Sequence, residues 1–196
     1  MALFEPVEGA TPIEDVSDLI PTHILTRAEL NEWEAANILK ATQKYLAQRK
    51  PPVITIEWLK KIHKDMFDQT WIWAGKLKKK NYNIGVDWHK VPEELKLLTD
   101  DIEYWNKGNG GPALFEQSVR IHHRLAKIHP FVNGNGRHAR LVADIFLYAH
   151  GLKLPDWPKA SLIEETNIRK RYIQALQEAD KSNYKPLEQF TKKLIR

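Results

Sequence analysis

The sequence predicts an all-α fold, a helical domain with one small β-hairpin and a helical extension at its N-terminus.

 Apolar residues recur at helical spacing along most of the chain. Runs of Gly, Pro and Asn separate these segments. Only residues 70–88 combine mixed aromatics with two glycines, a composition typical of a short hairpin. The 196 residues are enough for one domain with a buried core.

The first helix begins at a capping box. Residues 1–25, rich in proline and acidic residues, predict an extended arm packed on the body. Thr26 can then cap a helix in which Glu29 reaches back to the cap. This helix is expected to run to about Gln48, because two prolines follow shortly afterwards.

The later helices follow from the spacing of apolar residues. Thr55 can cap a second helix that carries Trp58, Leu59, Ile62 and Met66 on one face. Further helices are expected over residues 93–107, 114–128, 161–179 and 186–194.

Composition indicates a soluble protein. The hydrophobic content is 42%, the mean hydropathy is −0.51, and no run of 18 apolar residues predicts a transmembrane helix. The first residues lack a basic-then-apolar signal pattern. The absence of cysteine excludes disulfides and thiolate metal sites and fits a reducing compartment, so a cytoplasmic location is expected.

The net charge of +5 is dispersed along the chain. Its tightest run, residues 76–80, is typical of a solvated face, and it could steer an anionic ligand or an acidic target toward a cleft. No zinc-finger, helix-turn-helix or aromatic-basic pattern points to nucleic acid as a partner. The sequence leaves open whether the protein forms a homodimer.

Residues 129–140 carry the groups needed to bind a polyphosphate while a hydroxyl attacks it. The stretch reads His-Pro-Phe-Val-Asn-Gly-Asn-Gly-Arg-His-Ala-Arg. His129 can accept a proton near neutral pH. The glycines let backbone N–H groups approach an anion closely. Arg137 and Arg140 offer forked donors that match phosphate oxygens.

This stretch opens a buried helix. Residues 141–150 are mostly apolar, and Gly151 is a natural C-cap. The helix N-terminus adds N–H donors and a partial positive charge, and Arg137 and Arg140 would project from one face. The alternative is an ordinary helix-connecting loop with arginines on its solvated side.

The stretch resembles the signature of Fic-domain proteins, His-x-Phe-x-Asp/Glu-Gly-Asn-Gly-Arg-x-x-Arg, and departs from it only at Asn133. Residues 73–75 with 83–86 resemble the family's β-hairpin flap, and residues 172–179 resemble a late family helix. Residues 25–34 are similar to a bacterial subfamily called mobile mystery protein B.

The resemblance implies a Fic catalytic domain over residues 51–196, preceded by an arm and an inhibitory helix within residues 1–50. It implies transfer of AMP from ATP to a Ser, Thr or Tyr hydroxyl of a protein, with Mg²⁺. His129 would be the general base, and Phe131 would be the buried anchor of its loop. The residues that would contact the nucleotide are Asn133, Gly134, Asn135, Gly136, Arg137, Arg140 and Tyr172.

Two of these assignments have open alternatives. Ile84 and Gly85 would lie in the flap, where a target segment can add a strand, or they form an ordinary tight hairpin. Tyr172 would reach the nucleotide from the late helix, or it is a buried core tyrosine.

Glu34 is the candidate inhibitory residue. Many Fic proteins carry a helix with the pattern Ser/Thr-x-x-x-Glu-Gly/Asn, whose glutamate pairs with the last arginine of the motif, here Arg140. The stretch Leu-Asn-Glu-Trp-Glu-Ala at residues 30–35 lacks the hydroxyl residue and the Gly/Asn. The alternative is an exposed helix glutamate.

Asn133 bears on the type of transfer. The acidic residue of the family pattern binds Mg²⁺, and an amide oxygen can coordinate without the negative charge. Transfer of another nucleotide or of a phosphate group, or a silent nucleotide-binding or partner-binding module, therefore stays open. In the related Doc toxins, which phosphorylate a protein, lysine replaces the second glycine, so Gly136 favours AMP transfer.

Other histidines and tryptophans have structural interpretations. His122 and His123 are adjacent, so they point to different helix faces and are expected to pack rather than to bind metal. Trp71, Trp73 and Trp88 flank the predicted hairpin and either pack it down or line a groove for the target.

Overall fold

The computed structural model describes residues 16–47, 49–108, 110–158 and 166–196. Within these residues the chain is mostly helical, as predicted. The helices are α1 (Arg27–Tyr45), α2 (Ile56–Phe67), η1 (Trp88–Lys90, a short 3-10 helix), α3 (Val91–Asn106), α4 (Leu114–Ile128), α5 (Asn135–Ala149), α7 (Asn167–Asp180) and α8 (Lys185–Lys193).

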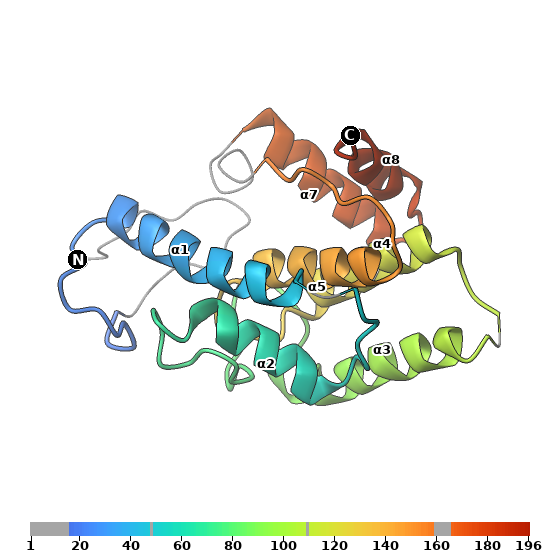
Figure 1. The fold of residues 1–196 in the computed structure, drawn as a ribbon. Helices are drawn as coiled ribbons and strands as arrows, with labels where there is room; N and C mark the ends of the chain where they lie inside the picture. Colours follow the sequence, from blue (N-terminus) through green and yellow to red (C-terminus); the bar gives the residue numbers. More distant parts are fainter. Residues whose placement is uncertain (1–15, 48, 109, 159–165) are drawn as a thin grey trace.

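Helices α4 and α5 form the centre of the fold (Figure 1). Helices α2 and α3 pack on one side of this pair, and α7 and α8 pack on the other. Helix α1 lies along α2. The loop between α4 and α5 therefore lies where segments from distant parts of the sequence meet.

Two groups of buried side chains hold these layers together. The larger core lies among α2, α3, α4 and α5 and contains Leu59, Ile62, Ile121 and Phe146. The smaller core lies among α4, α7 and α8 and includes Tyr172. Because α4 contributes to both cores, its C-terminal end has a fixed position between them.

The predicted caps are present. Thr26 Oγ1 accepts a hydrogen bond from Glu29 N at 3.2 Å, and Glu29 Oε2 accepts one from Thr26 N at 2.9 Å. Thr55 Oγ1 likewise accepts from Trp58 N at 3.1 Å. Helix α1 ends at Tyr45, slightly before the predicted end at Gln48, which lies outside the described residues.

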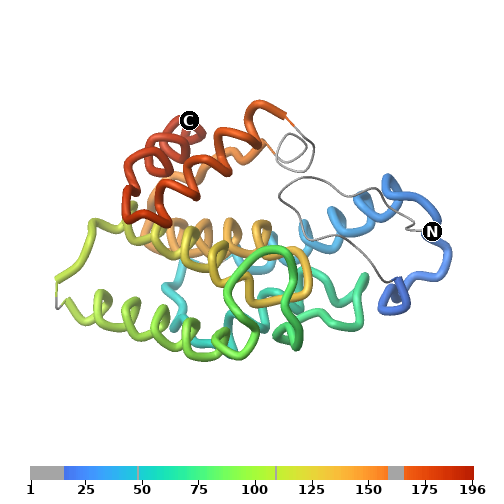
Figure 2. Tube along the Cα trace, turned by 180° about the vertical axis from the view of Figure 1, so that it is seen from behind, coloured from blue at the N-terminus to red at the C-terminus, as the bar shows by residue number. Residues whose placement is uncertain are grey.

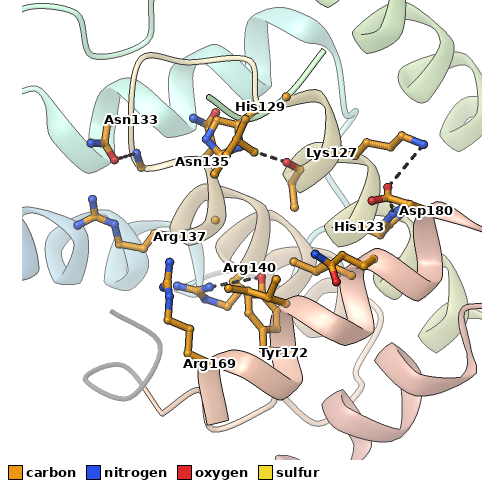
Figure 3. Close-up of a pocket in the computed structure, with 18 of the residues that line it drawn as sticks. His123, Lys127, His129, Asn133, Asn135, Arg137, Arg140, Arg169, Tyr172 and Asp180 are labelled. Atoms are coloured by element: carbon orange, nitrogen blue, oxygen red, sulfur yellow. Dashed lines mark hydrogen bonds and ion pairs between the residues drawn. The ribbon is translucent and has the colours of Figure 1, made fainter. Parts of the chain in front are cut away.

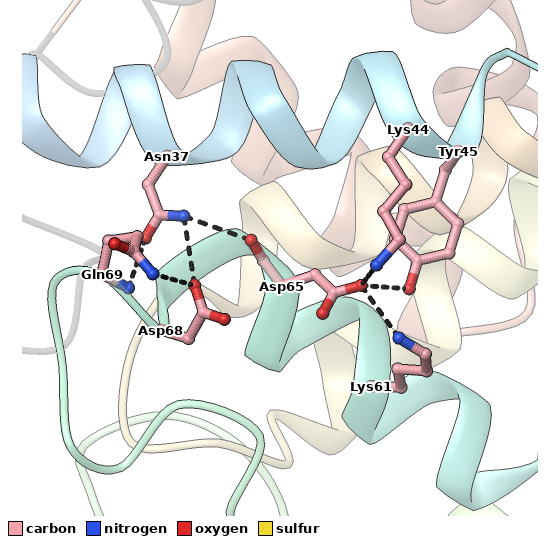
Figure 4. A network of polar contacts seen from close by, with 7 residues as sticks. All are labelled: Asn37, Lys44, Tyr45, Lys61, Asp65, Asp68 and Gln69. Carbon is pink, nitrogen blue, oxygen red and sulfur yellow. Dashed lines mark hydrogen bonds and ion pairs between the residues drawn. The ribbon is translucent and has the colours of Figure 1, made fainter.

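A polar network fixes α1 on α2 (Figure 4). Asp65 Oδ2 accepts hydrogen bonds from Lys44 Nζ at 2.6 Å, Tyr45 Oη at 2.7 Å and Lys61 Nζ at 3.2 Å. Two turns earlier in α1, Asn37 Nδ2 donates to Asp65 O at 3.2 Å. Asn37 Oδ1 accepts from Gln69 N at 3.0 Å. These bonds set the position of the α1 face that carries Glu34.

The segment predicted as a hairpin, residues 70–88, does not form a two-stranded ladder. The backbone of each arm bonds to the end of α4 or to the α4–α5 connection, and the Asn81 side chain links the two arms through Asp87 and Trp88 N. Lys78 N donates to Pro130 O at 2.9 Å, and Val86 N donates to Ile128 O at 3.3 Å. We call residues 76–87 the flap. Figure 2 shows it as a green loop that lies beside the α4–α5 connection.

Parts of two predictions lie outside the described residues. These are residues 1–15 of the predicted arm and residues 161–165 of the predicted helix over 161–179. The described end of the arm packs on the body through an antiparallel bridge between Leu19 and Trp71. Among the described helices, none combines the length and apolar character needed to cross a membrane.

Candidate functional site

His129 caps the C-terminal end of α4 in the left-handed conformation, with φ 53° and ψ 60°. Its Nδ1 lies 3.2 Å from Ala126 O, so a proton on Nδ1 can be donated to that carbonyl. The neutral ring then carries its lone pair on Nε2. Burial lowers the pKa of His129 to about 4, against the raising effect of Ala126 O and with a further lowering by Lys78. The imidazole is therefore neutral at pH 7.

The flap covers His129 closely. Gly85 has φ 100°, and a Cβ at this position would overlap Cβ of His129 and lie 2.9 Å from Ile128 O. A residue with a side chain therefore cannot occupy this turn without moving the flap away. Ile84 and Gly85 both line the cavity beside His129.

Phe131 and Asn135 lock the connecting loop. Asn135 Oδ1 accepts from Phe131 N at 2.9 Å, and its Nδ2 donates to Phe131 O at 3.0 Å. The Phe131 ring is fully buried. Because the Asn135 side chain is directed into the loop, its backbone N–H is the group that it can offer to an anion.

His63 supports this loop from α2, a role that the sequence did not predict. Its ring stacks on Phe131 with centroids 3.7 Å apart. Nδ1 accepts from Gly75 N at 2.9 Å, and Nε2 then donates to Asn133 O at 3.0 Å. Burial is the main reason that the pKa of His63 lies well below its usual value, so the ring stays neutral.

The loop leads directly into the N-terminus of α5. Gly134 is the N-cap, with φ 74°, and Asn135 is the first helical residue. A Cβ at Gly134 would overlap the ring of Phe67. The first turn of a helix leaves its N–H groups without intrahelical partners, so Asn135, Gly136 and Arg137 present amides at this end of the cavity.

Glu34 pairs with Arg137. Glu34 Oε2 accepts from Arg137 Nη1, whereas the family pattern leads us to expect Arg140. The other oxygen, Oε1, accepts from Trp71 Nε1 at 2.7 Å. Glu34 is only 4% exposed, which excludes the alternative of an exposed helix glutamate. The position of α1 on α2 brings Glu34 to the first arginine of the motif and not to the second.

Arg140 faces α7. Its Nη1 lies 3.5 Å from Tyr172 Oη, and its guanidinium lies over the rings of Tyr172 and Trp157. His122 Nε2 lies 2.8 Å from Tyr172 Oη. Burial lowers the pKa of His122 to about 3, so this ring is neutral as well. Tyr172 is thus a buried tyrosine that also lines the cavity.

One cavity of about 580 Å³ joins these groups. Figure 3 shows the arginines at one side and His123, Lys127 and Asp180 at the other. The sequence-predicted residues that line it are Glu34, Ile84, Gly85, His129, Asn133, Gly134, Asn135, Gly136, Arg137, Arg140 and Tyr172. The sequence reasoning missed Arg27, Asn31, Lys127, Arg169 and Asp180, which also line it. Their polar or charged side chains alone did not distinguish them from solvated residues.

Asn133 lines the cavity, but its amide oxygen is engaged locally. Asn133 Oδ1 accepts from Gly134 N at 2.6 Å. An amide oxygen is an acceptable Mg²⁺ ligand, and a side-chain rotation would be needed to offer it. Among the described residues, no group of three His, Cys, Asp or Glu side chains could hold a metal ion. The residues present therefore fit a metal that is held mainly by a ligand's own oxygens.

The other aromatic residues pack as part of the fold. His123 Nε2 lies 3.0 Å from Asp180 Oδ1. Trp71 and Trp73 are buried and stacked with centroids 5.1 Å apart, which favours packing over a groove for the target. Trp88 is half-buried against His89.

Comparison with known proteins identifies relatives. Residues 53–147 match the Fic/DOC family. The chain is 26% identical over 119 residues to the protein adenylyltransferase Fic of Drosophila virilis, covering 60% of this chain and 23% of that protein. It is 26% identical over 140 residues to the protein of the same name from Drosophila melanogaster, covering 70% and 27%. The chain thus spans about a quarter of the length of these relatives.

Solved structures share the fold. The Bartonella tribocorum effector BepC with bound AMPPNP superposes with a TM-score of 0.66, at 21% identity over 88% of this chain and 89% of that one. A Fic domain from Bartonella quintana with bound ADP also has a TM-score of 0.66, at 22% identity over 89% and 88%.

Proposed function

We propose that this chain, whose residues 53–147 match the Fic/DOC family, transfers AMP from ATP to a hydroxyl side chain of another protein. The observation that carries the proposal is the shared cavity, in which His129 lies beside the N-terminus of α5 and Arg137. Nucleotides bound in similar structures and the adenylyltransferase names of the curated relatives support it.

The phosphates would bind at the start of α5. Backbone amides of Asn135, Gly136 and Arg137 would donate to phosphate oxygens, and the helix end supplies a partial positive charge. Arg137 would hold the outer phosphates, and Arg140 would stabilise the site from the next turn. Mg²⁺, when bound through the phosphates and Asn133, would neutralise part of the negative charge.

His129 would act as the general base. Its Nε2 would take the proton of the target hydroxyl while the hydroxyl oxygen attacks the α-phosphorus. The bond between the α-phosphorus and the bridging oxygen of the β-phosphate would break, and pyrophosphate would leave with the electron pair. Little covalent help is needed, because positioning and charge stabilisation provide most of the catalysis.

The flap would present the target hydroxyl. Ile84 and Gly85 lie beside His129, and an extended target segment could pair with the backbone there. This mode of docking depends on the main chain and would tolerate different target sequences.

Glu34 would restrain the enzyme. While its carboxylate accepts from Arg137, that arginine is not available to the outer phosphates. We therefore assign inhibition to the segment of residues 1–50 and transfer to residues 51–196. Glu34→Gly should raise AMP transfer or self-modification at fixed ATP. Glu32→Gly, an exposed position on the same helix, is the matched control. Unchanged labelling in folded Glu34→Gly would exclude the restraint.

A labelling experiment tests the transfer. The protein and its Glu34→Gly variant are incubated with Mg²⁺, cell lysate and ATP labelled on either the α- or the γ-phosphate. We expect protein labelling from the α-label alone and its loss in His129→Ala, by a factor of about 100 or more. Labelling from γ alone would indicate phosphorylation instead. No labelling from either, even in Glu34→Gly, would indicate a silent binding module.

A further inference from the structure

The two arginines at the start of α5 have different surroundings. Arg137 donates to the carboxylate of Glu34, which compensates its charge. Arg140 belongs to none of the ion pairs in the described part of the chain. Its guanidinium lies over two aromatic rings instead, 5.7 Å from the centroid of Tyr172 and 5.8 Å from that of Trp157. Aromatic rings attract a guanidinium without occupying the N–H groups that a carboxylate would take.

The indole of Trp157 is held from two sides. Its Nε1 donates to both carboxyl oxygens of Asp144 at 3.0 Å. Asp144 follows Arg140 by four residues on α5, so the two side chains lie on the same face of that helix. The backbone just before the indole bonds to the end of α8, where Asp156 N donates to Leu194 O at 2.8 Å. Both contacts keep the indole over Arg140.

The ring of Tyr172 is held by His122 of α4. His122 Nε2 lies 2.8 Å from Tyr172 Oη, and the two rings stack with centroids 5.7 Å apart. The same imidazole meets the Trp157 ring edge-on at 5.4 Å. Burial, followed by the charge of Arg140, lowers the pKa of His122 to about 3, so this imidazole adds no competing charge. Three uncharged rings that contact one another therefore surround Arg140.

The ring of Trp157 can affect a ligand only through its neighbours. Arg140 and Tyr172 line the cavity, whereas Trp157 lies behind them and outside its lining. Figure 3 shows the Arg140 guanidinium beside the Tyr172 ring. An unrestrained arginine loses much rotamer freedom when it binds a ligand, and that loss is smaller when the side chain is already ordered.

We propose that Trp157 is a positioning residue for the nucleotide: its indole holds Arg140 against Tyr172, so that the guanidinium meets phosphate oxygens already ordered. Because Arg137 is paired with Glu34, Arg140 is then the motif arginine available to an incoming polyphosphate. The inference rests on the proposed binding of a nucleotide, but the ordering of Arg140 can be measured without one.

The first test measures the affinity of the full chain for AMPPNP and for AMP, each with Mg²⁺, by calorimetry. Trp157→Leu removes the ring, and Trp157→Phe keeps a ring but removes the bond to Asp144. Trp105→Leu is the matched control, because it removes a half-buried tryptophan that lies outside the cavity lining. We expect the AMPPNP affinity to fall about tenfold in Trp157→Leu, less in Trp157→Phe and not in the control.

AMP separates positioning from a general loss of structure. It lacks the outer phosphates, so Trp157→Leu should change its affinity by less than about twofold. Equal losses of AMP and AMPPNP affinity in this variant would overturn the proposal.

A double substitution tests whether the indole acts through the arginine. In an Arg140→Met background, adding Trp157→Leu should leave the AMPPNP affinity unchanged within about twofold. A further loss as large as that in the wild-type background would mean that the indole supports the fold alone, which contradicts a positioning role.

The Arg140 side chain gives a readout that needs neither nucleotide nor substitution of Trp157. In the wild type we expect the heteronuclear NOE of Arg140 Nε to be similar to that of the α5 backbone amides, and an NOE between Hε and the Trp157 ring; Arg140→Met assigns the signal. Folded Trp157→Leu should lower the heteronuclear NOE.

A mobile Arg140 Nε in the wild type refutes the proposal whether or not the Trp157 variants fold. Absence of AMPPNP binding in both the wild type and Glu34→Gly would instead count against the proposed function. The NMR measurement would still decide whether Trp157 holds Arg140.

Discussion

The 129–137 loop and helix α1 both line the same cavity, but different kinds of contact hold each of them there. The loop has its own short-range bonds, the paired bonds between Asn135 and Phe131, in addition to support from His63 of α2. Helix α1 reaches it through Glu34, which is 103 residues from its partner Arg137. The comparison indicates that the groups for the proposed chemistry are encoded locally, whereas the contact that would restrain them depends on packing between distant segments.

The largest expected effect concerns the loop and its packing on Phe67 of α2. Gly134→Ala should destabilise the protein by about 3 kcal/mol and abolish nucleotide binding, because the Cβ overlaps Phe67 at φ 74°. Gly108→Ala is the matched control, with φ 73° and open space around the Cβ, and should cost about 1 kcal/mol. Urea unfolding compares the two. Equal costs would show that the contact with Phe67 does not constrain the loop.

Acid should loosen the loop through its buried histidines. His63 and His138 support the loop region, and the pKa of each is lowered by burial, that of His138 to about 4. The unfolded chain binds these protons near pH 6.5, so stability is present above that pH and is lost as the pH falls toward 4. The slope is up to about 1.4 kcal/mol per pH unit for each histidine. A flat urea-unfolding profile between pH 6.5 and 4.5 would contradict this.

A buried carboxyl group beside Arg140 should give the opposite pH dependence of stability. Burial raises the pKa of Asp144 to about 7, although Trp157 Nε1 donates to both of its oxygens. The unfolded chain releases this proton near pH 3.8, so stability is lost as the pH rises from about 4 to 7. The loss is at most about 1.4 kcal/mol per pH unit. Asp144→Asn should remove this loss. Between pH 5 and pH 7 the free energy of unfolding should therefore increase more in the variant than in the wild type, because both proteins share the histidine contribution. Equal increases in the two proteins would contradict the prediction.

The smallest expected effect concerns the contact between α1 and the cavity that Glu34 makes. Trp71→Phe removes the hydrogen bond to Glu34 Oε1 but leaves the pair with Arg137. Labelling should rise by about tenfold, less than in Glu34→Gly, because one hydrogen bond to a charged group contributes about 1.5 kcal/mol. Trp73→Phe, a stacked neighbour with no such bond to Glu34, is the control. A rise equal to that of Glu34→Gly would mean that the indole alone holds the carboxylate in place.

The same division explains what could be predicted from sequence. The helices, their Thr caps and the loop at the start of α5 depend on neighbouring residues, so their patterns could be read directly. The partner of Glu34 could not, because it depends on how α1 lies on α2. The support of the loop by His63 also depends on packing between distant segments.

The flap shows a second limit of prediction from the sequence. Its aromatics and glycines are typical of a hairpin, and the composition cannot reveal that both arms pair with the α4–α5 connection. Lys78 belongs to a basic run whose sequence is typical of a solvated face, but its own side chain is buried. Burial of a single lysine depends on the partner segment, which the local pattern does not contain.

The central claim is that the phosphates of a nucleotide bind at the start of α5 beside His129. Its most direct test is a titration of the ¹⁵N-labelled protein with AMPPNP and Mg²⁺, followed by the amide resonances. We predict that the largest shifts occur at Asn135, Gly136 and Arg137 and that the His129 imidazole also shifts. Shifts confined to residues outside the cavity, with these amides unchanged at saturation, would contradict the account.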